Sequence, residues 1–563
     1  MGGWRWTRSL PVVGWARAYE ARNLRFDLLA GVTLAAFAVP ESLAYASLAA
    51  VPPQVGLYAA IAAMLTYAVF GSSRVLATGV TSALAVLTAG TVGRLAGGDP
   101  GRAAAMAAFA ALVAGAAALA GWLCRLGFLA NLVSRSVLTG FSAGAGLYIA
   151  STQLPKLFGV EGAEGGFFGR MGGFFEHVGA MRWPTLAAGG AALLLLVIGK
   201  KFAPRLPSTL LVVALALVLA PVLDLARHGV TVVGEIPRGL PAPGFPADAL
   251  GAWRSLLPLG LSIFVLSYVE GVSAARSLAA KHGGRVDPNQ ELLANAAGNL
   301  VSGLFHGMAV GGSLTRSSVN VEVGARTPLS GAIGGALLLI VVALLTGVFR
   351  NLPETVLAAI ILMAVAELVD VRALRRIFDL SKREAAIAFL SALGVLLFGV
   401  LWGVAIGVAA SLLDLLERAT FPHTAVLGRV PGTDEYADQE LHPENQPVEG
   451  VLAVRVDASV VFANAHTVKE DILEQVRRHA EPVRLLVLDL ESSPLLDLSG
   501  AGMLDELRAA LEAEGITVKL AGAKAAARDL LRAEAPERFA DLEPGLDVGR
   551  AVRAWLSQHP RHA

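Results

Sequence analysis

A cluster of hydroxyl side chains surrounds a permanent cation in "AVGGSLTRSSVN", residues 309–320. Four hydroxyl residues flank Arg316: Ser313, Thr315, Ser317 and Ser318. A helix that begins near Ser313 has first N–H groups without intrahelical acceptors, and its dipole adds about half a positive charge there. Ser313 and Thr315 can cap such a helix or donate hydrogen bonds, and Arg316 adds a full charge with a planar donor fork. These residues predict an anion-binding site. The alternative is that the hydroxyl groups only cap a helix and that the Arg316 side chain extends to the membrane–water interface.

A second short, glycine-interrupted apolar segment, "VLATGVTSALAVLTAG", spans residues 75–90. Thr81 and Ser82 lie at its start and would supply the opposite half of the anion site, and Tyr45 completes the candidate set. Such broken segments in corresponding places of two halves indicate a site built from half-helices. The two halves show no convincing repeat at the level of individual residues.

Two carboxylates lie within apolar sequence. Glu41 follows a proline in "AVPESLAYASLAAVPP", and Glu270 lies in "LGLSIFVLSYVEGVSAARSLAAK". At helical spacing Glu270 shares a face with Ser267, Ser273 and Ser277, so that face is expected to point inward. Both carboxylates are candidates for proton coupling. The alternatives are a structural hydrogen bond or an ion pair with Arg276 or Arg316 and, for Glu41, contact with water at the broken helix.

The elements that carry these residues must be membrane-spanning helices. Of the 563 residues, 55% are hydrophobic and 16% are charged. The charged fraction is well below the usual share of about 25% in soluble domains. Apolar runs such as "GAIGGALLLIVVALLTGV" are long enough to cross a bilayer. Cys124 is the only cysteine, which excludes intrachain disulfides and C-x-x-C metal sites. We expect no cofactor, no bound metal and no enzymatic activity, because no nucleophile–base pair or phosphate loop stands out.

The chain is expected to contain four parts. They are an arginine-rich N-terminal segment at 1–27, a transmembrane domain at 28–420, a linker at 421–448 and an α/β domain at 449–563. Twelve clear apolar segments and the two broken ones predict fourteen spans. An even number of spans, together with the positive N-terminus, places both termini in the cytoplasm and the protein in the inner membrane of the cell.

Strand and helix patterns alternate in the C-terminal part, for example the strand "VRLLVLDLES", the turn "PLLDLSGAG" and the helix "MLDELRAALEAEG". Asp497 and Ser499 lie where a helix follows a buried strand. Asp497 is expected to cap that helix. The alternative is a regulatory loop, in which phosphorylation or a cytoplasmic protein partner acts at these two residues.

Several of these stretches resemble the sulfate permease (SulP) family of anion transporters. They are "PESLAYASLAAVPPQVGLYAA", "YAVFGSSRVLATG", "SVLTGFSAGAGLYIASTQLPKLFG", "GEIPRGLPAPGFP" and "GGSLTRSSVNVEVGARTPLSG". The "LDLSGAG" region looks like the STAS domain of those transporters. The resemblance implies an α-helical polytopic membrane protein with fourteen segments in two inverted repeats of seven. It also implies core and gate domains, a cytoplasmic α/β STAS domain and a homodimer. The anion is then expected between the third and tenth segments, at 78–83 and at Ser313, Thr315 and Arg316.

The resemblance implies a secondary active transporter of sulfate or a similar oxyanion that works by alternating access. Its similarity to plant sulfate transporters implies that the transporter is a proton symporter. "VEGVSAARSLAAK" resembles those transporters and places Glu270 at their coupling glutamate. Sodium-dependent bicarbonate members carry aspartate and threonine on the eighth segment, a pattern from which this chain departs. Bicarbonate or dicarboxylate transport and uncoupled anion conduction remain alternatives, as does a membrane-anchored sensor that signals through its STAS domain. The expected partners are an inorganic anion, protons, the lipid bilayer and a second copy of the chain, but not nucleic acid.

Overall fold

Long apolar runs form long helices in the first part of the chain. The structure, a computed structural model, describes residues 10–131, 134–163, 165–202, 208–283 and 285–559. The chain divides into a first unit, Met1–Ser411, and a second unit, Leu412–Ala563, and the division falls within helix α17 (Val400–Thr420). The expected segment 1–27 is described from residue 10 and contains α1 (Pro11–Arg17) and η2 (Ala21–Asn23). The domain limits expected from sequence stay predictions.

Six helical stretches of the described residues are long and apolar enough to cross a membrane. They are α2 (Leu24–Leu48) with η2, α3 (Pro53–Phe70), α5 (Pro100–Leu123), α8 (Trp183–Phe202), α10 (Trp253–His282) with η5 (Ala247–Ala252), and α13 (Leu329–Ile340) with η6 (Val341–Leu345) and η7 (Thr346–Asn351). Helix α8 exposes the aliphatic side chains of Leu194, Leu195, Val197 and Ile198, as expected for a helix in contact with lipid.

Shorter or more polar helices lie between these. They are α4 (Ser82–Ala96), α6 (Arg135–Phe158), α9 (Ser208–Val222), α11 (Pro288–Leu304), α12 (Leu314–Glu322), α14 (Glu354–Leu368), α16 (Lys382–Phe398) and α17. Connecting segments hold η3 (Leu126–Asn131), α7 (Phe167–His177), η4 (Val178–Ala180) and α15 (Val371–Leu380). The count of fourteen spans stays a prediction, since length and apolarity alone assign six.

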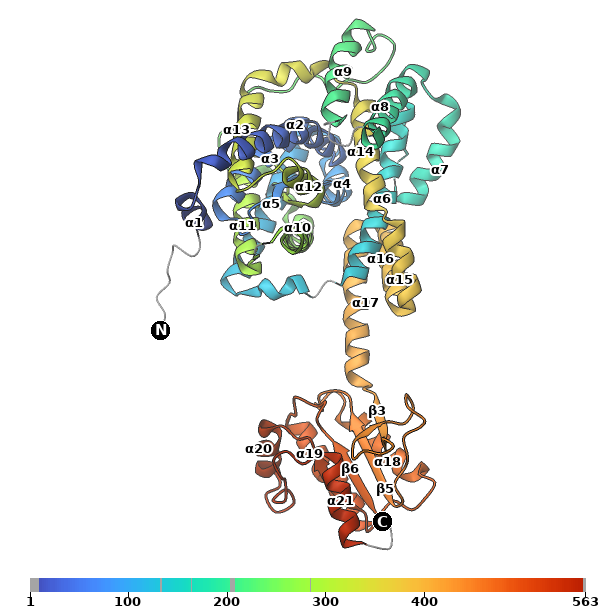
Figure 1. The fold of residues 1–563 in the computed structure, drawn as a ribbon. Helices are drawn as coiled ribbons and strands as arrows, with labels where there is room; N and C mark the ends of the chain where they lie inside the picture. Colours follow the sequence, from blue (N-terminus) through green and yellow to red (C-terminus); the bar gives the residue numbers. More distant parts are fainter. Residues whose placement is uncertain (1–9, 132–133, 164, 203–207, 284, 560–563) are drawn as a thin grey trace. The chain divides into compact units, whose positions relative to one another are not determined.

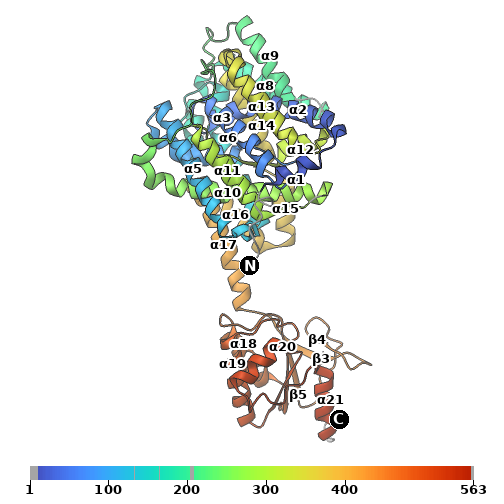
Figure 2. The same ribbon diagram turned by 90° about the vertical axis from the view of Figure 1, so that its left-hand side faces the viewer.

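The helices of the first unit pack in two groups (Figures 1 and 2). The core group contains α2 to α5 and α10 to α13, and the gate group contains α6, α8, α9, α14, α16 and the adjoining part of α17. The groups meet mainly where α2 contacts α9 and α14 and where α4 contacts α6 and α14. This division matches the core and gate domains that the resemblance implies.

A short β-ribbon connects the two broken segments. Strand β1 (Ala77–Gly79) pairs antiparallel with β2 (Gly311–Ser313), so that Ala77 lies opposite Ser313 and Gly79 opposite Gly311. Each strand leads directly into a short helix, β1 into α4 and β2 into α12. The ribbon therefore brings the starts of both half-helices to one place in the core group.

The second unit is an α/β domain built on one mixed sheet. Its strand order is β4-β3-β5-β6-β7, with β3 antiparallel to both neighbours and β5, β6 and β7 parallel. The strands are β3 (Thr424–Arg429), β4 (Tyr436–Asp438), β5 (Val451–Val456), β6 (Leu485–Asp489) and β7 (Thr517–Ala521). Helices α18 (Ala465–Arg478), α19 (Leu498–Ala513) and α20 (Ala525–Glu534) contribute to the hydrophobic cluster on one face, and α21 (Val548–Gln558) contributes to the other.

One feature of this unit differs from the sequence-based expectation. Residues 421–448, expected as a linker, contain β3 and β4, which are part of the sheet. The polar composition of this segment concealed the two strands. Helix α19 begins at Leu498, directly after its expected cap Asp497.

Candidate functional site

The two half-helices begin beside the ribbon with capped N-termini. Thr81 caps α4 by accepting a hydrogen bond from Leu84 N at 3.4 Å. Ser313 caps α12 in the same way, accepting from Arg316 N at 3.3 Å. The remaining first-turn N–H groups of each helix have no intrahelical acceptor and carry the positive end of the dipole. Two partial positive charges therefore lie at the ribbon, and the buried Ser82 follows the first cap.

Arg316 lies against the opposite half of the site and pairs with a carboxylate. Its side chain is only 1% exposed, and its Nη2 lies 2.9 Å from Glu41 Oε2 while Nε lies 3.1 Å from the same oxygen. Nη1 donates to Thr78 O at 3.2 Å, and Nη2 also donates to Val80 O at 2.9 Å. The ion-pair alternative from sequence thus describes this conformation, but with Glu41 as the partner. An anion contact of Arg316 stays a prediction.

Other polar side chains of α12 hold the segment before the ribbon. Ser317 Oγ accepts from Ala77 N at 2.7 Å and donates to Ser313 O at 2.5 Å, and Asn320 donates to Val75 O at 2.9 Å. Thr315, a predicted anion ligand, is exposed. Much of the hydroxyl and amide cluster therefore joins the two half-segments to each other.

Close packing around Arg316 requires glycine. A Cβ added at Gly79 would collide with the Arg316 guanidinium, and one at Gly312 would lie 2.7 Å from Gly271 Cα of α10. The missing side chains let the guanidinium and α10 approach the ribbon backbone directly. The glycines that interrupt the two apolar segments are thus part of the site's geometry.

Glu270 reaches the first half-helix from α10. Thr81 Oγ1 lies 3.5 Å from Glu270 Oε2, so the cap of α4 and this carboxylate are neighbours. The expected inward serine face of α10 is only partly observed, because Ser267 is buried whereas Ser273 is exposed. Tyr45 is buried one turn after Glu41 on α2.

Sequence reasoning missed a buried carboxylate on α11. Glu291 accepts hydrogen bonds from Tyr67 Oη at 2.9 Å, from Ser72 N at 2.9 Å and from Ser72 Oγ at 2.6 Å. Its position is recognisable from the i, i+4, i+8 spacing of Glu291, Asn295 and Asn299, which forms a polar stripe on this helix. These bonds hold the turn that leads into β1.

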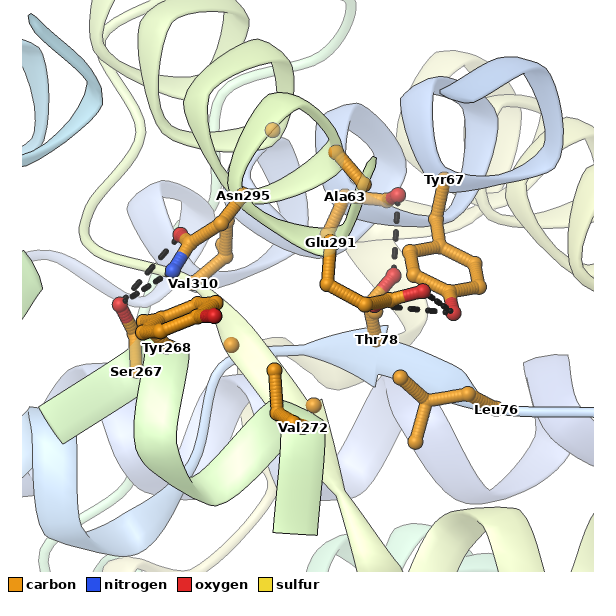
Figure 3. A pocket seen from close by; sticks show the side chains of 15 residues that line it. Ala63, Tyr67, Leu76, Thr78, Ser267, Tyr268, Val272, Glu291, Asn295 and Val310 are labelled. Carbon is orange, nitrogen blue, oxygen red and sulfur yellow. Dashed lines mark hydrogen bonds between the residues drawn. The ribbon is translucent and has the colours of Figure 1, made fainter. Parts of the chain in front are cut away.

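A cavity of about 30 Å³ lies between the ribbon and helices α3, α10 and α11 (Figure 3). Glu291 and Tyr67 lie on one side of it, and Ser267 and Asn295 on the other, with 2.9 Å between Asn295 Nδ2 and Ser267 Oγ. Such a volume accommodates about two water molecules. Polar groups therefore support the ribbon on the side occupied by α10 and α11.

The second unit contains the predicted regulatory pair. Asp497 Oδ1 accepts from Gly500 N at 2.8 Å, and Oδ2 accepts from Phe462 N at 2.8 Å. Asp497 therefore acts as the helix cap that the sequence predicts, while Ser499 is exposed in the first turn of α19. A regulatory role for these residues stays a prediction.

Comparisons with known proteins agree with this architecture. The model of the sulfate permease family matches residues 24–391, and the model of the STAS domain matches residues 442–544. A probable sulfate transporter of Mycobacterium tuberculosis (strain CDC 1551 / Oshkosh) is 38% identical over 533 residues, covering 93% of this chain and 95% of the relative. The chloroplastic sulfate transporter 4.1 of Arabidopsis thaliana is 32% identical over 523 residues, covering 89% of this chain and 76% of the relative.

Solved structures extend the comparison to the fold. The murine anion transporter Solute Carrier 26 family member A9, in its inward-facing state, matches with a TM-score of 0.90 at 22% identity, covering 99% of this chain and 96% of that one. The transmembrane domain of the cyanobacterial bicarbonate transporter BicA matches with a TM-score of 0.60 at 25% identity, covering 70% of this chain and 98% of that one.

The family models and the curated relatives define the class of protein, a multi-pass membrane transporter of anions with a C-terminal STAS domain. The chain belongs to the sulfate permease family. The family resemblance and the fold class expected from sequence are confirmed.

Proposed function

We propose that the protein carries sulfate or a similar oxyanion across the inner membrane together with protons. The family supports anion transport. The observation that carries the coupling proposal is the position of Glu270, 3.5 Å from the Thr81 hydroxyl that caps a half-helix. An oxyanion at the two helix N-termini would accept hydrogen bonds from their free N–H groups and from the caps.

Charge balance at the site favours proton coupling. Arg316 is paired with Glu41, so its charge is largely compensated and the ionisation of Glu270 decides the net charge near the N-termini. A proton on Glu270 removes the repulsion between this carboxylate and a bound dianion. Proton and anion then favour each other's binding, and this coupling is reciprocal.

The membrane potential makes such coupling necessary for uptake. An inside-negative potential opposes entry of a dianion by about 2.3 kcal/mol per charge per 100 mV. Co-transported protons compensate that charge. The ribbon, both half-helices and Glu270 belong to the core group, which touches the gate group at few helices. Movement of the core group against the gate group would expose this site alternately to the two sides of the membrane.

Three further features complete the proposal. Both termini face the cytoplasm, where the STAS domain is available to a protein partner at Ser499. The protein works as a homodimer. Bicarbonate is the second candidate anion, because the BicA transmembrane domain shares 25% identity with this chain.

Uptake into proteoliposomes tests this function. We expect labelled sulfate to accumulate when the side that contains sulfate is made acidic, and a sodium gradient to add nothing. Unlabelled bicarbonate and a dicarboxylate, added as competitors, rank the possible anions. Accumulation driven by a sodium gradient would contradict proton coupling. Flux of bicarbonate without flux of sulfate would contradict sulfate as the transported anion. A protein that moves no anion under any gradient would favour the sensor function.

A further inference from the structure

Helix α15 is a separate element between two apolar helices. Asp370 caps its start by accepting from Ala373 N at 2.9 Å, and Ser381 caps the following α16 by accepting from Glu384 N at 3.3 Å. The helix packs against α16 and α6 and has 10 residues, too few to cross a bilayer. It therefore lies where the chain turns between two membrane-spanning helices.

Positive charge is concentrated on this element. Residues 371–383 contain five basic side chains against the single acid Asp379: Arg372, Arg375, Arg376, Lys382 and Arg383. The three arginines of α15 itself are exposed. Within the part of the chain that the structure describes, no ion pair joins any of these three guanidinium groups to a carboxylate. Their charge is thus available to a partner outside the first unit.

Exposed apolar side chains border the same basic surface. Val371, Phe378 and Leu380 are 66%, 57% and 75% exposed. Val371 and Phe378 are seven residues apart and lie on one edge of the helix, next to Arg375. Lys382 Nζ lies 3.4 Å from the centre of the Phe378 ring. Basic residues beside exposed aromatic and aliphatic ones are typical of helices at a membrane surface.

The topology shows at which side of the membrane α15 lies. Helices α16 and α17 form an antiparallel pair, since Ser391 Oγ donates to Gly403 O at 3.1 Å and Gly394 packs on Gly403. The start of α16 and the end of α17 are therefore at the same side. Because α15 directly precedes α16, α15 lies at the side of the bilayer where α17 ends.

We propose that α15 binds the headgroups of anionic phospholipids in the leaflet at whose surface α17 ends. The lipid phosphates accept charge-assisted hydrogen bonds from Arg372, Arg375 and Arg376, while Phe378 and Val371 enter the boundary between headgroups and acyl chains. The bilayer is favoured as the partner because α15 is continuous with two membrane-spanning helices and carries apolar side chains beside its charges. Binding to an acidic protein surface would require only the positive charges of α15 and would leave its exposed apolar side chains without a role.

Spin-labelled lipids test the proposal on the full-length protein reconstituted in phosphatidylcholine. The measurement is the fraction of spin-labelled phosphatidylglycerol that the protein immobilises, relative to spin-labelled phosphatidylcholine. We expect the parent protein to prefer phosphatidylglycerol and the triple variant Arg372→Gln/Arg375→Gln/Arg376→Gln to lose most of this preference. The variant Arg372→Lys/Arg375→Lys/Arg376→Lys keeps the charge and should retain it.

The control variant Arg102→Gln/Arg182→Gln/Arg227→Gln removes three exposed arginines that lie outside α15. It should keep the preference of the parent. The proposal is overturned if the parent shows no preference for phosphatidylglycerol, as expected for an acidic protein partner, or if the α15 and control variants lose it equally.

Discussion

In the proposed mechanism, proton coupling depends on Glu270. We expect Glu270→Gln, which mimics the protonated carboxylate beside Thr81, to bind sulfate but to lose accumulation driven by a pH gradient. Exchange of sulfate for sulfate should continue, because it needs no net proton movement. Counterflow and gradient-driven uptake, measured in the same vesicles, separate the two activities.

The matched control is Glu322→Gln, which changes an exposed carboxylate on α12. It should keep accumulation. If Glu270→Gln accumulated sulfate with an unchanged pH dependence, the carboxylate would have a structural role, and Glu41→Gln would become the next variant to measure.

The pair Glu41–Arg316 leads to a second prediction at this scale. With the two side chains 2.9 Å apart, Glu41 competes with any anion for the guanidinium. Glu41→Gln should therefore raise anion affinity by roughly tenfold, about 1.4 kcal/mol. Binding of sulfate to the purified variant, by calorimetry, measures the change.

Glu41→Gln/Arg316→Gln is the control, because it removes both charges. It should bind sulfate more weakly than Glu41→Gln. Equal affinities of the parent and Glu41→Gln would mean that Arg316 only fastens α2 to the ribbon.

Residue types and helix periodicity were sufficient to select Glu41, Glu270, Thr81, Ser313 and Arg316 as candidates, and the structure places these five around one ribbon. They were insufficient to pair Arg316 with Glu41. That pair depends on how α2 packs against α12, which no local pattern encodes. Thr315 was selected by type alone; it is exposed in the structure, and its role as an anion ligand stays a prediction.

Among the elements, the ribbon has the most demanding geometry. We expect Gly79→Ala to weaken anion binding at least tenfold, since the added methyl group collides with the Arg316 guanidinium and overpacking costs about 1–3 kcal/mol. Gly90→Ala on α4 is the control, because a Cβ there has no neighbour within 4 Å. Sulfate binding and the thermal midpoint are measured for both. Parent-like binding by Gly79→Ala would show that the guanidinium can move without loss of the site.

The helices of the first unit were predictable because apolar runs of membrane-spanning length leave few alternatives. The strands β1 and β2 were not. Their sequences, "ATG" and "GGS", have low β-propensity, and their pairing connects distant parts of the chain. The breaks in the apolar pattern marked their places without revealing that they pair.

At the scale of the whole molecule, the position of β3 decides where the chain can be divided. A protein cut after Thr420 keeps α17 and should be extracted as a folded membrane unit. A cut at Gly432 leaves β3 attached without β4 and β5, and unpaired strand edges promote aggregation. Size-exclusion chromatography of both truncations compares them. If the shorter protein did not insert or fold, the two units would not be independent.

Acid stability is a property of the STAS domain that the structure predicts. Burial raises the pKa of Asp438, but hydrogen bonds from Leu441 N, Glu440 N and His423 outweigh this effect and hold the pKa below its ordinary value. A lowered folded-state pKa stabilises the domain above the unfolded-state value of about 3.9, and this contribution is lost as the pH falls through the folded-state pKa.

Asp438→Asn should therefore lower the free energy of unfolding of residues 421–563 by about 1–2 kcal/mol at pH 7, with a smaller difference below about pH 4. Urea unfolding across this pH range measures it, with the exposed Asp529→Asn as control. A difference that stays constant with pH would exclude the charge of Asp438 as its cause.

The pairing of Ala77 with Ser313 also has a consequence for biosynthesis. The first strand leaves the ribosome long before its partner, and at about 5–20 residues per second the interval is on the order of 10–50 s. During that time α4 is a 15-residue helix preceded by unpaired backbone groups, which a lipid environment does not satisfy. The first half of the protein is then expected to depend on the insertion machinery or on water near α4 until β2 and α12 have been synthesised. A nascent chain that carries Cys124→Ser and a single cysteine introduced by Val80→Cys should accordingly react with a water-soluble thiol reagent when it is stalled before residue 311, and the same chain stalled well past α12 should be protected.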